Sequence, residues 1–161
     1  MEVCILHLGS NLGDPQHNIS LAEYLIAKRI GLIGAKSRLY TTEPWGEVDQ
    51  NPFVNNALVV NTNLSAEEVL REISTIEKKM GRTRTEQWGP RIIDIDIIFY
   101  ADQIIKNDDL IIPHPRLTNR NFVLFPLADI CPDFVHPEMK KSIRAILTSS
   151  TDTLKVEVIH E

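Results

Sequence analysis

The sequence predicts a mixed α/β fold whose first hundred residues follow the order strand, helix, strand, strand, helix, strand. Stretches that favour an extended chain, most of them rich in Ile, Val and aromatic residues, lie at 3–8, 35–42, 53–60 and 92–100. Between them, 14–30 and 65–80 repeat apolar residues at helical spacing. The 161 residues are 43% hydrophobic and 24% charged, which predicts a single domain with a core over 1–161.

The first strand, Val3–Leu8, leads into the turn Gly9–Gly13. Its glycines suggest a phosphate-binding loop, but the Gly-Lys-Ser/Thr ending that reaches the phosphates is missing. The stretch 31–37 has the wrong spacing as well, so we expect no P-loop. His7, inside the strand, is expected to be packed or to face the surface rather than to act in catalysis.

The first helix begins at Asp14, which suits the N-cap position, with Pro15 at the first helical position. Its buried stripe is Ile19, Ala22, Leu25, Ile26 and Ile30. A strand over Ala35–Thr42 is expected to end at Glu43-Pro-Trp-Gly46, which opens a long loop that reaches Pro52.

The third strand, Phe53–Val60, contains Asn55 and Asn56 among apolar residues. A buried amide needs hydrogen-bond partners, so these side chains either meet the heteroatoms of a ligand or make bulge or turn hydrogen bonds. Trp45, in the preceding loop, is suited to stacking on a flat ring and equally to anchoring the loop.

The second helix begins at Ser65, which forms a Ser-x-x-Glu capping box with Glu68. Its buried stripe is Val69, Leu70, Ile73, Ile76 and Met80. Gly81 ends the helix, and the following segment contains Gly89 and Pro90, which predicts a loop.

Two acids lie within the strand Ile92–Tyr100. Side chains alternate along a strand, so Asp94 and Asp96 are expected to share one face. The other face is expected to carry Ile93, Ile95, Ile97 and Phe99. The two acidic Cα atoms lie about 7 Å apart, so the pair could hold one or two hard cations. An isolated Asp-x-Asp also occurs on ordinary solvated strand faces.

Arg82, Arg84 and Arg91 lie in the loop before these acids. Guanidinium groups bind phosphate oxygens, and acids for Mg²⁺ beside an arginine-bearing loop are typical of phosphoryl or pyrophosphoryl transfer. The alternative is that these arginines are surface charges that pair with Glu77 and Glu86.

The last third of the chain is expected to hold shorter elements. Ile104–Ile105 and Leu110–Ile112 predict edge strands, and 121–130 and 142–147 predict short helices. The weak alternation over 154–159 predicts a final strand.

Composition limits the class of protein. The net charge of −5 argues against bulk binding to nucleic acid. There is no apolar run of membrane-spanning length and no basic-then-apolar leader, so we expect a soluble protein without a membrane partner. Cys4 and Cys131 lack metal-ligand spacing and fit a reducing compartment, the cytoplasm. We expect a monomer whose partners are small molecules.

Several blocks, in this order, resemble the 6-hydroxymethyl-7,8-dihydropterin pyrophosphokinases (HPPK), an enzyme family of the folate pathway. The blocks are Gly9-Ser-Asn-Leu-Gly13, Tyr40-Thr-Thr-Glu-Pro-Trp-Gly46, Asp49-Gln50, Phe53-Val-Asn-Asn56, Glu77-Lys-Lys-Met-Gly-Arg82, Trp88-Gly-Pro-Arg-Ile-Ile-Asp-Ile-Asp96, Pro113-His114 and Asn119-Arg-Asn-Phe-Val-Leu-Phe-Pro126. The segment 82–96 is highly specific to that family. The resemblance implies a ferredoxin-like α/β (α+β) fold with a mainly antiparallel sheet flanked by helices, which agrees with the element order above.

The resemblance also implies an activity, in which the terminal pyrophosphate of ATP moves to the pterin's hydroxymethyl group and AMP is released. It implies that Asp94 and Asp96 bind two Mg²⁺ ions and that Arg82 and Arg91 act with them in catalysis. The positions matching ATP contacts are Glu77, Arg84, Trp88, Arg91, Ile97, His114 and Arg120. The positions matching the pterin pocket are Thr42, Glu43, Trp45, Phe53, Asn55 and Phe122.

Two other interpretations stay open at this point. A different metal-dependent transferase or nuclease on the same fold would use the acids and arginines but would not release AMP in a pterin-dependent way. A non-catalytic ligand sensor would keep its ligand binding after Asp94→Ala, whereas an enzyme would lose most of its rate.

Overall fold

The computed structural model describes residues 1–42, 51–82 and 91–160. Its elements in chain order are β1 (Glu2–Ser10), α1 (Pro15–Arg29), β2 (Gly31–Lys36), β3 (Tyr40–Thr42), β4 (Phe53–Thr62), α2 (Ala66–Lys79), β5 (Asp94–Tyr100), β6 (Ile105–Lys106), β7 (Ile111–Ile112), the 3₁₀ turn η1 (Leu117–Asn119), α3 (Asn121–Ile130), α4 (Ile143–Thr148) and β8 (Val156–Val158).

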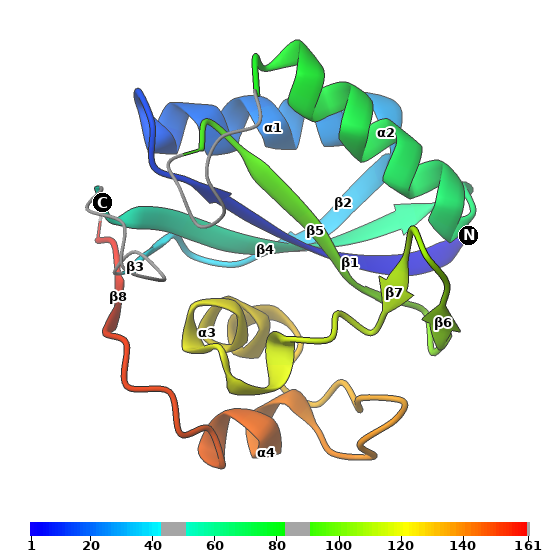
Figure 1. Cartoon of the computed structure of the whole chain (residues 1–161), viewed down its shortest axis with the longest axis vertical. Helices are drawn as coiled ribbons and strands as arrows, with labels where there is room; N and C mark the ends of the chain where they lie inside the picture. Colours follow the sequence, from blue (N-terminus) through cyan, green and yellow to red (C-terminus); the bar gives the residue numbers. More distant parts are fainter. Residues whose placement is uncertain (43–50, 83–90, 161) are drawn as a thin grey trace.

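One antiparallel sheet organises the molecule, with the strand order β5-β1-β4-β3-β8. β2 and β3 pair with successive parts of β4, so together they take the place of a single strand. Helices α1 and α2 cover one face of the sheet, and α3 lies against the other, with α4 packed on the far side of α3 (Figure 1). The ferredoxin-like α+β fold that the sequence predicts is therefore confirmed.

The sheet separates two apolar cores. Leu6 and Ile97 lie in the core beneath α1 and α2, together with Ile26 of α1. Ile5 faces the opposite core, together with Leu124 of α3. Adjacent residues of β1 thus serve different cores because side chains alternate along a strand. Burying each of these side chains contributes about 2 kcal/mol, which holds the helices on both faces.

Both predicted helix starts are present. The Asp14 side chain accepts a hydrogen bond from the backbone N–H of His17 at 3.2 Å. Ser65 and Glu68 form the reciprocal capping box at the start of α2. Each cap satisfies N–H groups that a first helical turn otherwise leaves without partners.

The predicted strand over 35–42 is wrong in its extent. A strand already begins at Gly31, and the chain is interrupted at residues 37–39 before β3. At the interruption, the Ser37 hydroxyl accepts a hydrogen bond from Ala57 N at 2.9 Å. A side-chain oxygen thereby takes the role that a strand carbonyl has in a regular ladder, and the chain leaves the register.

The predicted face of Phe99 is also wrong. The pairing of β1 with β5 shifts by one residue between Ile5, opposite Phe99, and Leu6, opposite Ile97. This β-bulge places Ile98 and Phe99 in the core beneath α3, whereas Ile97 faces α1 and α2. Strict alternation fails beyond the bulge because one strand contains an extra residue there.

The segments predicted as edge strands pair only with each other among the described residues. The short strands predicted there are present as β6 and β7, and they form a separate two-stranded sheet. The helix at 121–130 is found as predicted, and the final strand β8 is shorter than the predicted 154–159.

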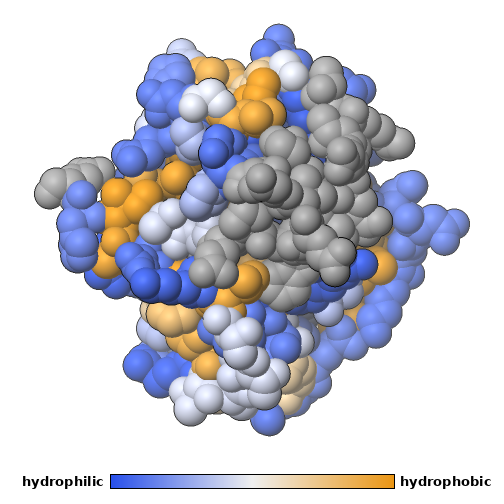
Figure 2. Space-filling model, turned by 60° about the vertical axis from the view of Figure 1, so that its left-hand side comes forward, coloured by the Kyte–Doolittle hydropathy of each residue, from blue (hydrophilic) through white to orange (hydrophobic). Residues whose placement is uncertain are grey.

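The surface combines hydrophilic side chains with scattered apolar ones. On the face drawn in Figure 2, apolar side chains occur as separate patches among hydrophilic neighbours. Single exposed apolar residues of this kind are common on protein surfaces. In the described part of the chain, every helix falls short of the length and apolar character that a membrane span needs.

Gly31 permits the close approach of β2 to β4. A Cβ at this position would lie 2.1 Å from the backbone oxygen of Asn61 and 3.0 Å from Thr62 Cα. Gly31→Ala must therefore push two backbones apart, and we expect the free energy of unfolding in urea to fall by about 2 to 3 kcal/mol.

The matched control is Gly34→Ala, where the nearest atom to a new Cβ is the movable Asn61 side-chain nitrogen at 3.0 Å. We expect this variant to lose less than about 1 kcal/mol. Equal losses in the two variants would contradict the account of β2.

Candidate active site

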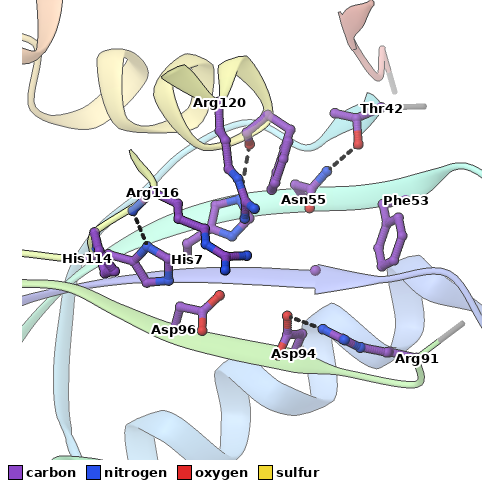
Figure 3. Close-up of a pocket in the computed structure, with 13 residues that line it drawn as sticks. His7, Thr42, Phe53, Asn55, Arg91, Asp94, Asp96, His114, Arg116 and Arg120 are labelled. Carbon is purple, nitrogen blue, oxygen red and sulfur yellow. Dashed lines mark hydrogen bonds and ion pairs between the residues drawn. The ribbon is translucent and has the colours of Figure 1, made fainter. Parts of the chain in front are cut away.

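A cavity of about 400 Å³ opens between the sheet and the start of α3. Nine residues proposed from the sequence line it, namely Thr42, Phe53, Asn55, Arg91, Asp94, Asp96, His114, Arg120 and Phe122. Four further lining residues carried no site prediction: His7, Gly9, Pro115 and Arg116. Figure 3 shows these side chains converging from β1, β4, β5 and the chain before α3.

Strand register explains the convergence. His7 lies opposite Asp96, and Gly9 lies opposite Asp94 on one side and Asn55 on the other. Residues paired across neighbouring strands project from the same face. Because β1 pairs with both neighbours, Asp94 and Asp96 of β5 and Asn55 of β4 project from the same face of the sheet.

Asp94 is held by two arginines. Its Oδ1 atom lies 3.1 Å from Arg82 Nη1, and its Oδ2 atom lies 3.0 Å from Arg91 Nη1. Arg82 Nη1 also lies 2.7 Å from Glu77 Oε2. All four side chains are at most 29% exposed, so these pairs are screened less than surface pairs.

Backbone hydrogen bonds fix this cluster in space. Glu77 Oε2 accepts a hydrogen bond from Ile95 N at 2.9 Å, which joins the end of α2 to β5. Arg91 N donates to Asn11 Oδ1 at 2.7 Å, and Asn11 N donates to Arg91 O at 3.0 Å. The chain leading into β5 is thus tied to the end of β1.

Asp96 lies on the same strand face as Asp94 and is partly exposed to the cavity. Burial, with the nearby negative charges of Asp94 and Glu77, raises the pKa of Asp96 well above that of an ordinary aspartate. Burial likewise raises the pKa of Glu77. Three carboxyl groups therefore lie beside Arg82 and Arg91, and a bound cation would favour the ionised form of Asp96.

The carboxylate pair suits a Mg²⁺ site in which the protein supplies only part of the coordination shell. Within the described ranges, no three His, Cys, Asp or Glu side chains come together as a ligand set. Asp94 and Asp96 could thus supply two hard oxygen ligands, with phosphate and water oxygens completing the shell. Mg²⁺ commonly binds in this way, through one or two carboxylates and substrate phosphates.

His7 is buried, as predicted, but it also faces the cavity. Its Nε2 atom lies 3.0 Å from the carbonyl oxygen of Phe122, so Nε2 carries the hydrogen and donates. The His7 and Phe122 rings also meet edge to face at 5.8 Å. Burial lowers the pKa of His7 to about 4, which keeps the imidazole neutral near pH 7.

The other half of the cavity combines aromatic and amide groups. Asn55 Nδ2 donates to Thr42 Oγ1 at 2.8 Å, and Phe53 and Phe122 line the space beside this pair. A Cβ at Gly9 would lie only 2.8 Å from Asn55 Oδ1, so glycine leaves room for that amide. Aromatic walls with an oriented amide suit a flat, polar-edged ring.

Cationic and imidazole groups line the side toward η1. His114 Nδ1 accepts a hydrogen bond from Arg116 N at 3.2 Å. Burial, assisted by the positive charges of Arg120 and Arg116, lowers the pKa of His114 to about 4. Near neutral pH the imidazole is thus an uncharged hydrogen-bonding group beside arginines that attract anions.

A second cavity of about 280 Å³ lies beyond Asp96 and His114, which line both cavities. Ile97 lines this second cavity, together with Leu70 of α2 and Ile111 of β7. The predicted nucleotide residue Ile97 is therefore absent from the lining of the first cavity but lies immediately beside it.

Comparison with known proteins assigns residues 5–132 to the family described as 7,8-dihydro-6-hydroxymethylpterin-pyrophosphokinase (HPPK). The chain belongs to this family. The 2-amino-4-hydroxy-6-hydroxymethyldihydropteridine pyrophosphokinase of Aquifex aeolicus is 36% identical over 156 residues, which cover 94% of each chain. The family predicted from the sequence blocks, and with it the enzyme class, is confirmed.

Longer proteins contain similar segments. Folic acid synthesis protein FOL1 of Dictyostelium discoideum is 44% identical over 137 residues, which are 85% of this chain but 21% of that protein. The crystal structure of a Plasmodium falciparum HPPK-DHPS triple mutant superposes with a TM-score of 0.77 at 20% identity, over 91% of this chain and 43% of that one. The latter similarity supports the HPPK-like fold.

The remaining proposed site residues of the HPPK chain fall into two groups. Glu43, Trp45, Arg84 and Trp88 lie outside the described residues. Glu77 and Arg82 reach the site through their contacts with each other and with Asp94 and Ile95, as given above.

The two alternatives left open for the asparagines have separate outcomes. Asn55 faces the cavity, whereas Asn56 projects from the opposite face and donates from Nδ2 to Glu23 Oε2 at 2.8 Å. The ligand interpretation therefore suits Asn55, and the structural interpretation suits Asn56.

His7 predicts a pH dependence of stability. The pKa of His7 is about 4 in the folded protein and ordinarily 6.5. Between pH 4 and 6.5 the imidazole is therefore protonated in the unfolded chain and neutral in the folded one. Stability from the neutral imidazole is thus lost as the pH falls from 6.5 to 4, by up to about 3 kcal/mol. His7→Gln, which keeps a donor but does not titrate, should flatten this part of the urea-unfolding profile.

The control is His17→Gln, at an exposed position of α1, which should keep the profile of the unaltered protein. An unchanged pH profile in His7→Gln would refute the assignment of a neutral, buried His7.

Proposed function

We propose that this chain transfers the terminal pyrophosphate of ATP to the hydroxymethyl group of 6-hydroxymethyl-7,8-dihydropterin in folate biosynthesis, with release of AMP. Membership of the HPPK family supports this activity. The structural observation that carries the proposal is a single cavity with two different halves. One half contains paired carboxylates and arginines, and the other contains aromatic rings and an oriented amide.

The reaction forms one phosphorus–oxygen bond and breaks another. The hydroxymethyl oxygen bonds to the β-phosphorus, and the bond from that phosphorus to the oxygen bridging toward the α-phosphorus breaks. The bridging oxygen leaves with AMP, and the alcohol loses its proton. Because negative charge shifts toward the bridging oxygen and the transferred group, cationic side chains on this side lower the barrier.

Arg82 and Arg91 are the residues proposed for this task. Each guanidinium group has five N–H donors. In the structure, the Nη1 atom of each arginine contacts Asp94. The remaining donors can bind phosphate oxygens in a planar, bidentate manner. The two arginines thereby orient the triphosphate above the carboxylates.

Asp94 and Asp96 are the proposed ligands of two Mg²⁺ ions. When bound, Mg²⁺ would neutralise phosphate charge and lower the pKa of a coordinated alcohol. The protein's own contribution is to hold both carboxylates on one rigid strand face, close to the end of β1.

The pterin is proposed to occupy the aromatic half. Phe53 and Phe122 supply flat apolar walls, and Asn55 with Thr42 supplies a polar edge. The neutral His7 side chain positions Phe122 by donating a hydrogen bond to its backbone carbonyl oxygen. Glu43 and Trp45 remain proposed pterin contacts by family resemblance.

The nucleotide is proposed to lie along the cationic side. His114 and Arg120 face the cavity, and Ile97 lines the adjoining one. Glu77 holds Arg82, while Arg84 and Trp88 stay proposed ATP contacts by resemblance.

We further propose that residues 1–161 form one catalytic domain that acts as a cytoplasmic monomer on small molecules. Support for the compartment comes from Cys4 and Cys131, which are free thiols. Burial raises the pKa of each to about 12, which makes them poor nucleophiles.

The direct test is to incubate the protein with ATP, Mg²⁺ and the hydroxymethyl dihydropterin and to identify the products by chromatography. We expect AMP and pterin pyrophosphate. Asp96→Asn should lower kcat about 10³-fold, because it removes a charge that acts on the reacting phosphates. Its melting temperature should not fall, since a neutral amide replaces a carboxyl group whose ionisation is already disfavoured in the ligand-free site. ADP as product, or AMP formed without pterin, would refute the proposed function.

Gly9 tests the location of the pterin. In Gly9→Ala the new Cβ would displace the Asn55 amide, and we expect the KM for the pterin to rise about tenfold, with the KM for ATP within about twofold. The control is Ser10→Ala, a neighbouring residue whose side chain contacts Asn18 on the opposite face. Equal changes in both KM values for Gly9→Ala would argue against the pterin lying beside Asn55.

A further inference from the structure

The C-terminal strap, residues 150–158, runs from the start of α3 to the edge of the sheet (Figure 1). It lies beyond the segment 5–132 that matches the family model. The strap nevertheless contacts two elements that carry cavity residues, the first turn of α3 and strand β3.

The first anchor is Asp152 at the start of α3. The backbone N–H of Asn121 donates to Asp152 Oδ2 at 2.8 Å, and Asn121 Nδ2 donates to Asp152 O at 3.3 Å. Arg120 occupies the N-cap position of α3 and makes no side-chain capping bond to the helix. A carboxylate from a distant part of the chain therefore caps this helix and complements its dipole.

Neighbouring contacts make this anchor rigid. Asn119 Oδ1 accepts hydrogen bonds from Thr151 N at 2.8 Å, from Thr151 Oγ1 at 3.1 Å and from Ser150 Oγ at 3.3 Å. Asp152 Oδ1 accepts from Leu154 N at 3.0 Å, which fixes the carboxylate within the strap.

The second anchor is the pairing of β8 with β3. Val156 pairs with Thr42, and Ile159 N donates to Leu39 O at 2.8 Å. Only four residue-to-residue steps separate Asp152 from Val156, a span of at most about 14 Å. The strap consequently limits how far the start of α3 can move from β3.

Each of these two elements carries a residue that lines the aromatic half of the cavity. Phe122 follows Asn121 directly, and Thr42 is the strand residue that receives the hydrogen bond from Asn55. We propose that the strap sets the separation between Phe122 and Thr42 and that Asp152 is a positioning residue for pterin binding. The proposal rests on the proposed function in one respect, the identity of the flat ligand.

The test compares Asp152→Ala with the unaltered full chain. We measure the Kd for 6-hydroxymethylpterin by fluorescence in the presence of Mg²⁺ and α,β-methylene-ATP, and KM and kcat in the AMP assay. Losing the cap should raise the Kd and KM for the pterin about tenfold and leave kcat at saturation within about twofold. Asp152→Asn keeps one oxygen acceptor and should restore much of the affinity.

The matched control is Asp133→Ala, which also removes one negative charge from the C-terminal third. The Asp133 side chain is 86% exposed and pairs only with Arg144 among the described residues, so pterin affinity should not change. A Kd for the pterin in Asp152→Ala equal to that of the unaltered protein would overturn the strap proposal, even if the melting temperature falls.

The two proposals fail in different ways. An unaltered protein that binds the pterin but forms no AMP would refute the proposed function alone. The ratio of the pterin Kd of Asp152→Ala to that of the unaltered protein would still test the strap proposal. An unaltered protein that binds no pterin would overturn both. Should Asp152→Ala not fold, Asn119→Ala removes the neighbouring strap contact with Thr151 and is expected to raise the Kd for the pterin as well. Unchanged pterin affinity in Asn119→Ala would then overturn the strap proposal.

Discussion

Carboxylates and guanidinium groups gather where β5 begins, and this cluster joins the parts of the site. Glu77 binds Arg82 and the backbone of Ile95, which fixes the end of α2 against the strand. Arg82 and Arg91 contact the oxygens of Asp94, while Asp96 lies in a desolvated position near the carboxyl groups of Asp94 and Glu77. Such crowding disfavours ionisation in the absence of a ligand. Ionisation of these carboxyl groups becomes favourable once metal cations bind together with the phosphates. The cluster is therefore better explained by a role in ligand binding than by a contribution to the stability of the fold.

The architecture places a second, chemically different wall beside this cluster. Strand β1 carries His7 and Gly9 between the acids of β5 and the amide of β4. Helix α3 packs on the same face, and its first turn presents Phe122 to the cavity. The helix does not hold this position by itself, since its N-terminus is capped by Asp152 and its Phe122 carbonyl is bound by His7. Local sequence, sheet register and the chain end all contribute to the shape of the aromatic half.

The sequence predicted those features that depend on local periodicity. Alternation along β5 placed Asp94 and Asp96 on one face, and helix capping signals located α1 and α2. It failed at Phe99, because a bulge depends on how two strands pair rather than on either alone. The place of His7 in the cavity could not be predicted for the same reason, since it depends on the register between β1 and β5. Residue-specific motifs identified the family, whereas long-range contacts such as that of Asp152 left no local signal.

The most direct measurement of the central claim is a crystal structure of the protein with Mn²⁺ and α,β-methylene-ATP, in which anomalous scattering locates the metal. The account predicts metal density between the carboxylates of Asp94 and Asp96, with Arg82 and Arg91 contacting the phosphates. Bound nucleotide with both carboxylates free of metal, and with both arginines still paired with carboxylates instead of phosphates, would contradict it.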